Sequence, residues 1–219
     1  ELGVTENKIT MVPNGIEKVK FLQFKESKQN INNKIFLITV ARFAKEKKGF
    51  DLIPLIAKML KEKKINFQWT IVGYNSKQIR MIDNMSNFEK NFKYLNNIEN
   101  LDEKFFPHNN LIKIYKSNHI YINLARIESF GMTIMEALAS GLPVVTFDTK
   151  GGNELIKNDY NGIIIKKLSP EQIVTAIDHY IKNTILYEKH KKNTIPSIEK
   201  FDLSLVAHKT IQGYKEVIN

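Results

Sequence analysis

The sequence contains no cysteine, which excludes disulfide bonds and metal sites built from thiolates. Proline and glycine are also scarce, with 6 and 10 of the 219 residues, while 42% of the residues are hydrophobic. This composition suits one sizeable globular domain with its own core. No apolar run approaches the roughly 18 residues that a membrane-spanning helix needs. The lack of cysteine agrees with a reducing compartment, and we expect a cytoplasmic protein.

Basic residues outnumber acidic ones, 33 to 23, so the formal net charge is +10. Such an excess can indicate nucleic acid, an anionic membrane surface or phosphorylated ligands as partners. The lysines are, however, mixed with acids, as in the "KEKK" runs at 45–48 and 61–64, which is typical of solvated helix faces. No basic motif with interleaved aromatic residues is present, so we expect no nucleic-acid partner.

Short apolar runs alternate with segments of helical periodicity along the chain, and this predicts an α/β fold with a parallel sheet covered by helices on both faces. Strands are expected at 35–41, 67–73, 92–95, 119–125, 142–147 and 162–166. Helices are expected at 51–64, 76–88 and 131–140, and throughout the tail from 170 onward. A further helix is expected through 116, with Asn109 or Asn110 as its N-cap.

Ligands of parallel sheets bind outside the carboxyl ends of the strands, so the loops after the strands are the place to look for a site. These loops bring two cations, two acids and several glycines to one rim: Arg42, Lys48, Gly73, Glu128, Gly131, Gly151 and Gly152. A lone cation in a loop is usually only solvated, but Arg42 and Lys48 share one loop. Together they can clamp a diphosphate, the arginine bidentately and the lysine as a point charge.

The stretch Phe130–Thr133 lies where a helix is predicted to begin. Free N–H groups and the helix dipole favour an anion there, and Gly131 lets a ligand approach the backbone, although a glycine can also simply fit a turn. Glu136 has apolar neighbours, which argues against a plain surface role, and its carboxylate can accept hydrogen bonds from two ribose hydroxyls. Glu128 would face the other end of the ligand. The combination predicts a nucleoside diphosphate that carries a sugar.

Four segments in this order resemble the C-terminal, nucleotide-sugar-binding domain of the family 4 retaining glycosyltransferases, which have the Rossmann-like GT-B fold. They are "ESFGMTIME" with its acid–seven residues–acid spacing, "ALASGLPVVTFDTKGGNELI", the phosphate loop "VARFAKEKKGF", and "MVPNGIE", similar to the segment that crosses between the two halves. The resemblance covers nearly the whole chain. It implies one domain over 1–219, with a crossing segment at about 1–30.

The resemblance also implies roles for single residues. Arg42 and Lys48 match the pair that binds the diphosphate and stabilises the leaving group, and Glu136 matches the acid that holds the ribose. Glu128 matches the acid beside the sugar hydroxyls and the reacting centre. Backbone groups of Phe130, Gly131 and Met132 match donors to the sugar and phosphate, and Thr133 and Gly73 are expected to line the same site. Similar enzymes use a UDP-sugar or a GDP-sugar, of which we favour UDP, and need no cofactor or metal because the cations replace it.

The sequence departs from the family pattern at two places, the first of them near the nucleobase. The sequence has Asn96 and Asn97 where a glycine is usual, and His119 where an aspartate is common. The acceptor-binding half of such enzymes precedes the crossing segment, so we expect a glycan or lipid-linked acceptor to be bound by a missing N-terminal domain. The isolated domain is expected to bind donor without efficient transfer. The resemblance also admits peripheral attachment of a full-length enzyme to the inner face of the membrane.

Two other functions are consistent with the sequence. A nucleotide-sugar epimerase also uses the GT-B fold, but is expected to differ at "ESFGMTIME". A non-catalytic module would bind the nucleotide sugar with both glutamates replaceable. Retained binding without transfer, even after the upstream half is restored, would identify the module.

Overall fold

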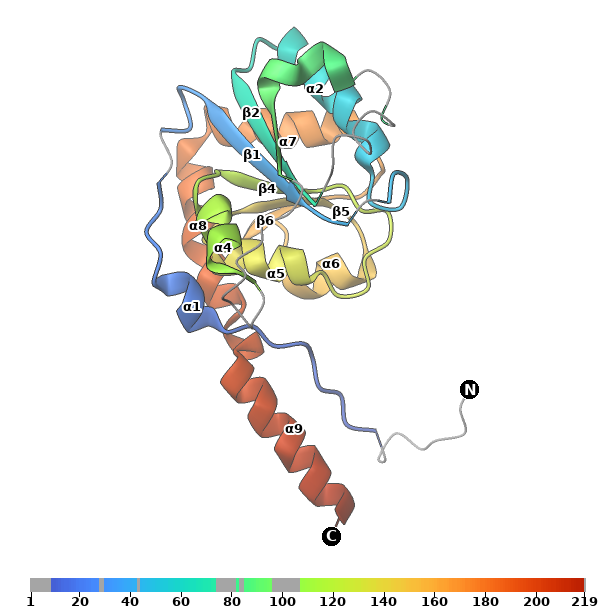
Figure 1. Ribbon diagram of the computed structural model, residues 1–219, viewed down its shortest axis with the longest axis vertical. Helices are drawn as coiled ribbons and strands as arrows, with labels where there is room; N and C mark the ends of the chain where they lie inside the picture. Colours follow the sequence, from blue (N-terminus) through green and yellow to red (C-terminus); the bar gives the residue numbers. More distant parts are fainter. Residues whose placement is uncertain are drawn as a thin grey trace.

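The computed structural model describes residues 9–27, 30–42, 44–73, 82, 85–95 and 107–218. Six parallel strands form one sheet in the order β3-β2-β1-β4-β5-β6 (Figure 1). The strands are β1 (Ile35–Val40), β2 (Phe67–Val72), β3 (Phe92–Leu95), β4 (Ile120–Asn123), β5 (Val144–Phe147) and β6 (Gly162–Ile165). The predicted α/β class and parallel sheet are confirmed.

Helices cover both faces of the sheet. They are α1 (Lys18–Leu22), α2 (Ile53–Glu62), α4 (Asn109–Lys116), α5 (Met132–Ala139), α6 (Lys150–Leu155), α7 (Pro170–Lys182), α8 (Thr184–Ser197) and α9 (Leu203–Ile218), with 3-10 turns η2 (Phe50–Leu52), η3 (Met85–Asn91) and η4 (Glu199–Phe201). Helices α2 and α7 pack together on one face, and α4, α5 and α6 lie on the other (Figure 1). A separate hydrophobic cluster fills each face.

The central strands are apolar on both faces because both faces are buried, as is usual for parallel sheets. All of β4 and β5 is buried, and β1 is buried except for Phe36. Short apolar runs therefore alternate with helical segments along the chain, because each buried strand is followed by a helix that covers one face of the sheet.

The predicted helix boundaries differ from the structure in a few places. Helix α4 begins at Asn109 and its N-cap is His108, so neither asparagine caps it. The segment 51–64 starts as the 3-10 turn η2 before α2, with Pro54 in the first turn where its missing N–H costs nothing. Most of the helix predicted at 76–88 lies outside the described residues, and residues 85–91 form η3. The short helices α1 and α6 were not predicted.

The strand order places a topological switch point between β1 and β4. From β1 the chain moves outward to β2 and β3, then returns to β4 beside β1 and continues to β6. The connection after β1 leads to α2 on one face, while the connection after β4 leads to α5 on the other (Figure 1). The two loops diverge at the carboxyl edge, which leaves a crevice of the kind that binds ligands in such sheets.

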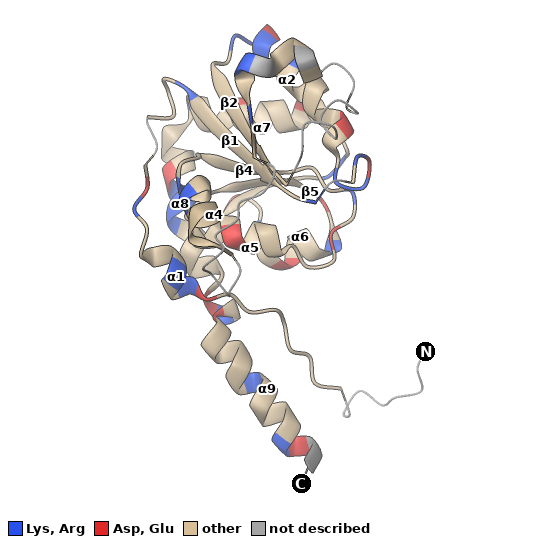
Figure 2. Ribbon diagram, in the orientation of Figure 1, with Lys and Arg blue, Asp and Glu red and all other residues tan. Residues whose placement is uncertain are grey.

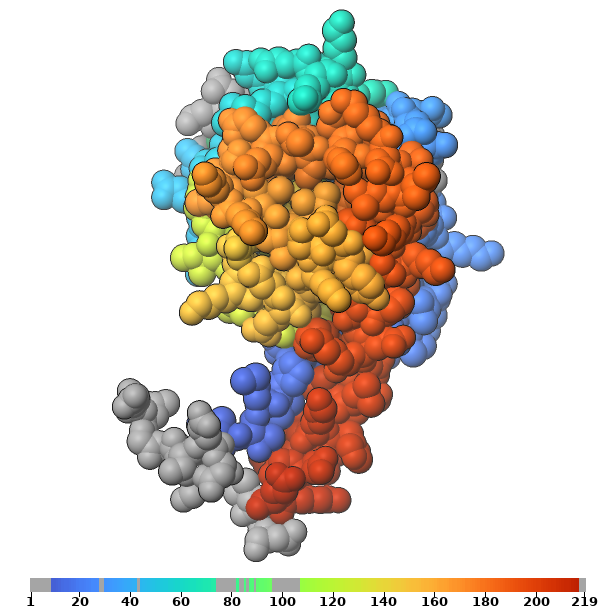
Figure 3. Space-filling view, turned by 180° about the vertical axis from the view of Figure 1, so that it is seen from behind, coloured from blue at the N-terminus to red at the C-terminus, as the bar shows by residue number. Residues whose placement is uncertain are grey.

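The C-terminal helix α9 extends away from the body of the molecule (Figures 1 and 3). Its start is joined to the N-terminal segment, because the Leu203 N–H donates to the Ile16 carbonyl at 2.9 Å. Basic and acidic side chains are distributed over many elements rather than gathered on one face in the view of Figure 2. Among the described residues, no helix is both long and apolar enough to cross a bilayer.

Candidate donor-binding site

A cavity of about 350 Å³ lies at the switch point. Its walls come from the end of β1, the loop after β1, the end of β4, the loop after β4 and the start of α5. The described lining residues are Val40, Ala41, Arg42, Lys48, Asn123, Glu128, Ser129, Phe130, Gly131, Met132 and Thr133. Seven of the nine site residues predicted from the sequence line this cavity: Arg42, Lys48, Glu128, Phe130, Gly131, Met132 and Thr133.

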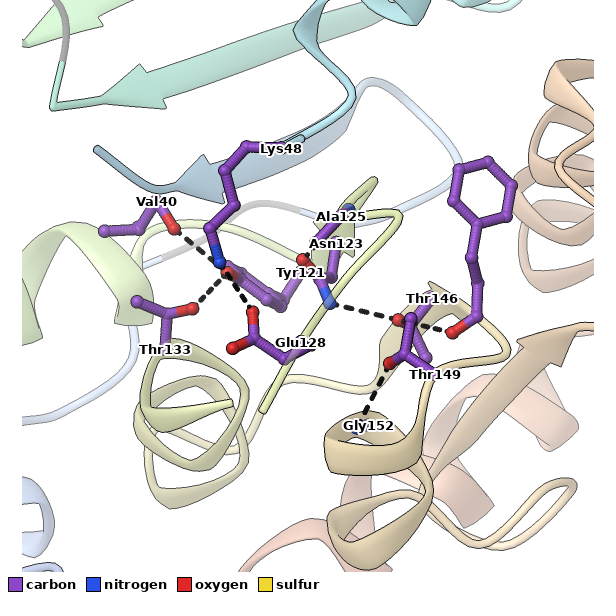
Figure 4. Close-up of polar contacts among 11 residues, drawn as sticks. Val40, Lys48, Tyr121, Asn123, Ala125, Glu128, Thr133, Thr146, Thr149 and Gly152 are labelled. Carbon is purple, nitrogen blue, oxygen red and sulfur yellow. Dashed lines mark hydrogen bonds and ion pairs between the residues drawn. The ribbon is translucent and has the colours of Figure 1, made fainter. Parts of the chain in front are cut away.

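An ion pair between two loops lines this cavity. The Lys48 amino group donates to a Glu128 carboxylate oxygen at 2.8 Å (Figure 4). Lys48 comes from the loop after β1 and Glu128 from the loop after β4. Their side chains are 25% and 13% exposed, so both are partly buried, and both residues line the cavity. The pair can open toward a ligand that offers an anion to Lys48 and hydroxyl groups to Glu128.

The start of α5 forms the opposite wall. Gly131 caps the helix with a φ of 93°, and it offers no side-chain acceptor to the N–H groups of the first turn. The first intrahelical bond runs from the Met135 N–H to the Gly131 carbonyl, at 3.0 Å. A Cβ at Gly131 would lie 2.9 Å from the Ile134 side chain, so a side chain here would crowd the turn. The arrangement leaves free donors and a positive helix end at the cavity.

Phe130 contributes backbone to the cavity while its ring packs elsewhere. The ring meets the Phe201 ring edge to face, with centroids 5.6 Å apart, beside the core cluster below α5. Its predicted role as a backbone donor is compatible with this placement and stays a prediction.

Arg42 and Gly73 lie at the same edge of the sheet but differ in their relation to the cavity. Arg42 is exposed, lines the cavity, and has no carboxylate partner among the residues that the structure describes. Gly73 does not belong to the described lining. Its φ is 96°, and a Cβ there would lie 2.3 Å from the Ala41 carbonyl oxygen, so close packing of the β1 and β2 ends requires the glycine.

Glu136 is buried beneath the cavity, outside its described lining. Only 2% of the residue is exposed, and the Tyr115 hydroxyl donates to its carboxylate at 2.8 Å. Burial raises the pKa of Glu136 to about 7, although the hydrogen bond from Tyr115 acts in the opposite direction. The ribose-binding role stays a prediction.

Several polar residues of the site escaped the sequence analysis. The Tyr121 hydroxyl lies 2.7 Å from the Thr133 hydroxyl and 3.2 Å from the Val40 carbonyl oxygen, so it ties α5 to β1 (Figure 4). The Asn123 amide donates to the Thr146 hydroxyl at 3.1 Å. Polar side chains within an apolar strand were the available signal, because a buried polar group needs a specific partner.

The double glycine after β5 supports the loop that carries Glu128. Thr149 caps α6 by accepting a hydrogen bond from the Gly152 N–H at 3.2 Å (Figure 4). The Gly151 N–H donates to the Glu128 carbonyl at 3.0 Å, and a Cβ on Gly151 would lie 2.4 Å from the Phe130 nitrogen. The glycines are therefore required for close packing of α6 against the loop, and they are not direct cavity residues.

A larger cavity of about 960 Å³ lies on the other side of the loop after β1. Its described lining includes Asp51, Pro54, Phe88 and Arg126. Size alone would favour it as the site, but Arg126 and Asp51 already form a bidentate ion pair there. The smaller cavity combines the exposed Arg42, the start of α5 and a position at the switch point, which makes it the better candidate for the site.

His119 has a structural role in this chain. It is 1% exposed, and its Nδ1 accepts a hydrogen bond from the Phe36 N–H at 2.9 Å, at the amino end of β1. It lies at the opposite end of the strands from the cavity. The departure from the common aspartate therefore concerns packing at that end.

The chain matches a family model described as glycosyl transferases group 1 over residues 21–196. An uncharacterized glycosyltransferase of Methanocaldococcus jannaschii is 27% identical over 207 residues, which cover 92% of this chain and 50% of that protein. A UDP-N-acetylglucosamine–peptide N-acetylglucosaminyltransferase subunit of Streptococcus agalactiae is 41% identical over 78 residues, 34% of this chain and 15% of that protein. The chain thus spans half or less of these two relatives.

Solved structures share the fold. A glycosyltransferase of Rickettsia africae superposes with a TM-score of 0.80 at 21% identity, covering 99% of this chain and 59% of that chain. The pneumococcal O-GlcNAc transferase, crystallised with UDP and GlcNAc, gives 0.70 at 23% identity, covering 95% and 38%. The strand order and helical tail match the C-terminal half of the GT-B fold. The chain therefore belongs to the group 1 glycosyl transferases, glycosyltransferase family 4, and corresponds to their C-terminal domain.

Proposed function

We propose that this chain is the donor-binding part of a retaining glycosyltransferase that transfers a hexosyl group from a UDP-sugar. The observation that carries the proposal is the meeting of Lys48, Arg42 and the start of α5 in one cavity at the switch point. Two cations and a row of unpaired N–H groups complement a diphosphate, while a carboxylate beside them complements sugar hydroxyls. The presence of UDP in the pneumococcal crystal, and of UDP with glucose in an Anabaena relative, supports uridine as the base.

The cavity also accounts for the chemistry expected of the transfer. Cleavage of the bond between sugar and β-phosphate leaves negative charge on the phosphate oxygens. Lys48, Arg42 and the helix end would stabilise this charge where it develops. Glu128 would orient the sugar, and its carboxylate would face the positive charge that grows at the anomeric carbon. The acceptor, a glycan or a lipid-linked sugar, would be bound by a further half of the enzyme.

Calorimetric titration of the chain with UDP tests the proposal. The double variant Arg42→Ala/Lys48→Ala removes two charge-assisted contacts, each worth about 1.5–3 kcal/mol, so UDP binding should weaken by at least about a hundredfold. The matched control is Lys189→Ala/Lys192→Ala, which removes two exposed lysines of α8 and lowers the net charge equally. The control should bind UDP like the wild type. Equal affinity in wild type and in the Arg42/Lys48 variant would refute the assignment.

A further inference from the structure

The Lys48–Glu128 pair joins two loops that are 80 residues apart in sequence. Its geometry therefore depends on how the two loops are placed relative to each other. The loop after β1 is internally compact. Its Lys48 N–H donates to the Ala44 carbonyl at 2.8 Å, and its Gly49 N–H donates to the Glu46 carbonyl at 3.0 Å. These bonds shape the loop, but they do not determine where it lies relative to Glu128.

Arg126 connects the two loops, and it stands two residues before Glu128. Its backbone N–H donates to the Lys47 carbonyl at 3.0 Å, and its guanidinium donates to the Glu46 carbonyl. The same guanidinium makes two parallel bonds to the Asp51 carboxylate, at 2.7 and 2.6 Å. All the acceptors lie within residues 46–51, on either side of Lys48. The planar fork of arginine suits this bidentate geometry, which a lysine cannot reproduce.

A close backbone approach adds a second point of contact between the loops. Gly49 has a φ of 70°, and a Cβ there would lie 2.0 Å from the Leu124 carbonyl oxygen. The loop after β1 is thus pressed against the end of β4 at Gly49 and bonded to it through Arg126. Lys48 is flanked in sequence by these contacts.

The Arg126–Asp51 pair is only partly buried, so its direct contribution to stability is modest. Its side chains are 28% and 27% exposed, and ion pairs with such access to water are typically worth less than about 1 kcal/mol. Arg126 lies in the described lining of the larger cavity and not in that of the smaller one. Its contacts therefore point toward loop geometry and away from direct contact with a ligand in the proposed site.

We propose that Arg126 is a positioning residue: by clamping residues 46–51 to the loop after β4, it places the Lys48 amino group where the diphosphate of the donor binds. The inference rests on the proposed function, because it assigns Arg126 a part in that same site. It adds a residue outside the cavity to those on which donor affinity depends.

A double-mutant cycle tests the inference, with UDP affinity measured by calorimetry for wild type, Arg126→Met, Lys48→Ala and the double variant. Because misplacing a binding group by about 1 Å can cost a large factor, Arg126→Met should weaken UDP binding about tenfold in the wild-type background. In the Lys48→Ala background it should change UDP binding by less than about twofold, since the group being positioned is gone. Equal effects in both backgrounds would show direct ligand contact and overturn the proposal.

Melting temperatures and further variants separate positioning from folding. A purely structural role would lower the melting temperature of Arg126→Met and leave UDP affinity unchanged, which would also overturn the proposal. If Arg126→Met does not fold, Asp51→Asn weakens the same clamp from the other side and should reproduce the loss of affinity. The matched control is Lys182→Met, which breaks a 2.7 Å pair with Asp178 on α7 and should leave UDP affinity unchanged.

The outcome also separates this inference from the proposed function. Failure of the wild type to bind UDP, or indifference of binding to Lys48→Ala, would count against the proposed function. Loss of affinity in Lys48→Ala with full affinity in Arg126→Met would refute only the positioning role.

Discussion

Replacing Glu128 with glutamine should strengthen the binding of UDP. In the free protein the Lys48 amino group is neutralised by the Glu128 carboxylate at 2.8 Å. A diphosphate that takes Lys48 as its partner must disrupt this pair or lie beside a like charge. In Glu128→Gln the side chain keeps its size, but the competing charge is gone, so Lys48 is free to bind the phosphate.

The burial of the pair sets the size of the effect. A hydrogen bond to a charged group contributes about 1.5–3 kcal/mol when buried, and a fully exposed ion pair about 0.2–1 kcal/mol. With side chains 25% and 13% exposed, the Lys48–Glu128 pair lies between these limits. We take about 1–1.5 kcal/mol, which corresponds to roughly fivefold to tenfold tighter UDP binding.

Calorimetry at constant ionic strength measures this change. Glu154→Gln is the matched control, because it removes one exposed carboxylate of α6 and raises the net charge equally. With a UDP-sugar the gain should be smaller, since the variant also loses an acceptor for the sugar hydroxyls. UDP binding that is unchanged or weaker in Glu128→Gln would refute the reasoning that Glu128 competes for Lys48.

Two further predictions concern the stability of the site. Burial raises the pKa of Glu136 from its usual 4.5 to about 7, so folding favours the protonated form, and the stability that this provides is lost as the pH rises from 4.5 through 7. Glu136→Gln cannot ionise, so its melting temperature relative to wild type should be higher at pH 8 than at pH 5; a pH-independent difference would contradict this. Gly49→Ala should lower the free energy of unfolding, measured by urea denaturation, by about 2–4 kcal/mol. The added Cβ would be strained at a positive φ and would clash with the Leu124 carbonyl oxygen. An unchanged unfolding midpoint would show that the loop shifts to accommodate the methyl group.

Much of the architecture followed from local pattern. Continuous apolar runs such as 35–40 and 144–147 specify strands buried on both faces, and their alternation with helical segments requires parallel pairing through crossovers. Because the carboxyl ends of parallel strands meet at one edge of the sheet, the sequence alone predicts Arg42, Lys48, Glu128 and Gly131 at one rim. These inferences succeed because they depend on hydrophobic period and chain direction, which adjacent residues carry.

Only the tertiary structure decided which of the rim residues meet and what each one touches. The Lys48–Glu128 bond and the Arg126 clamp join segments 75–80 residues apart, and no local period encodes such a register. The sequence did not indicate that Glu136 is buried and accepts a hydrogen bond from Tyr115. The side-chain direction on a short helix depends on how that helix packs, and packing is a property of the whole fold.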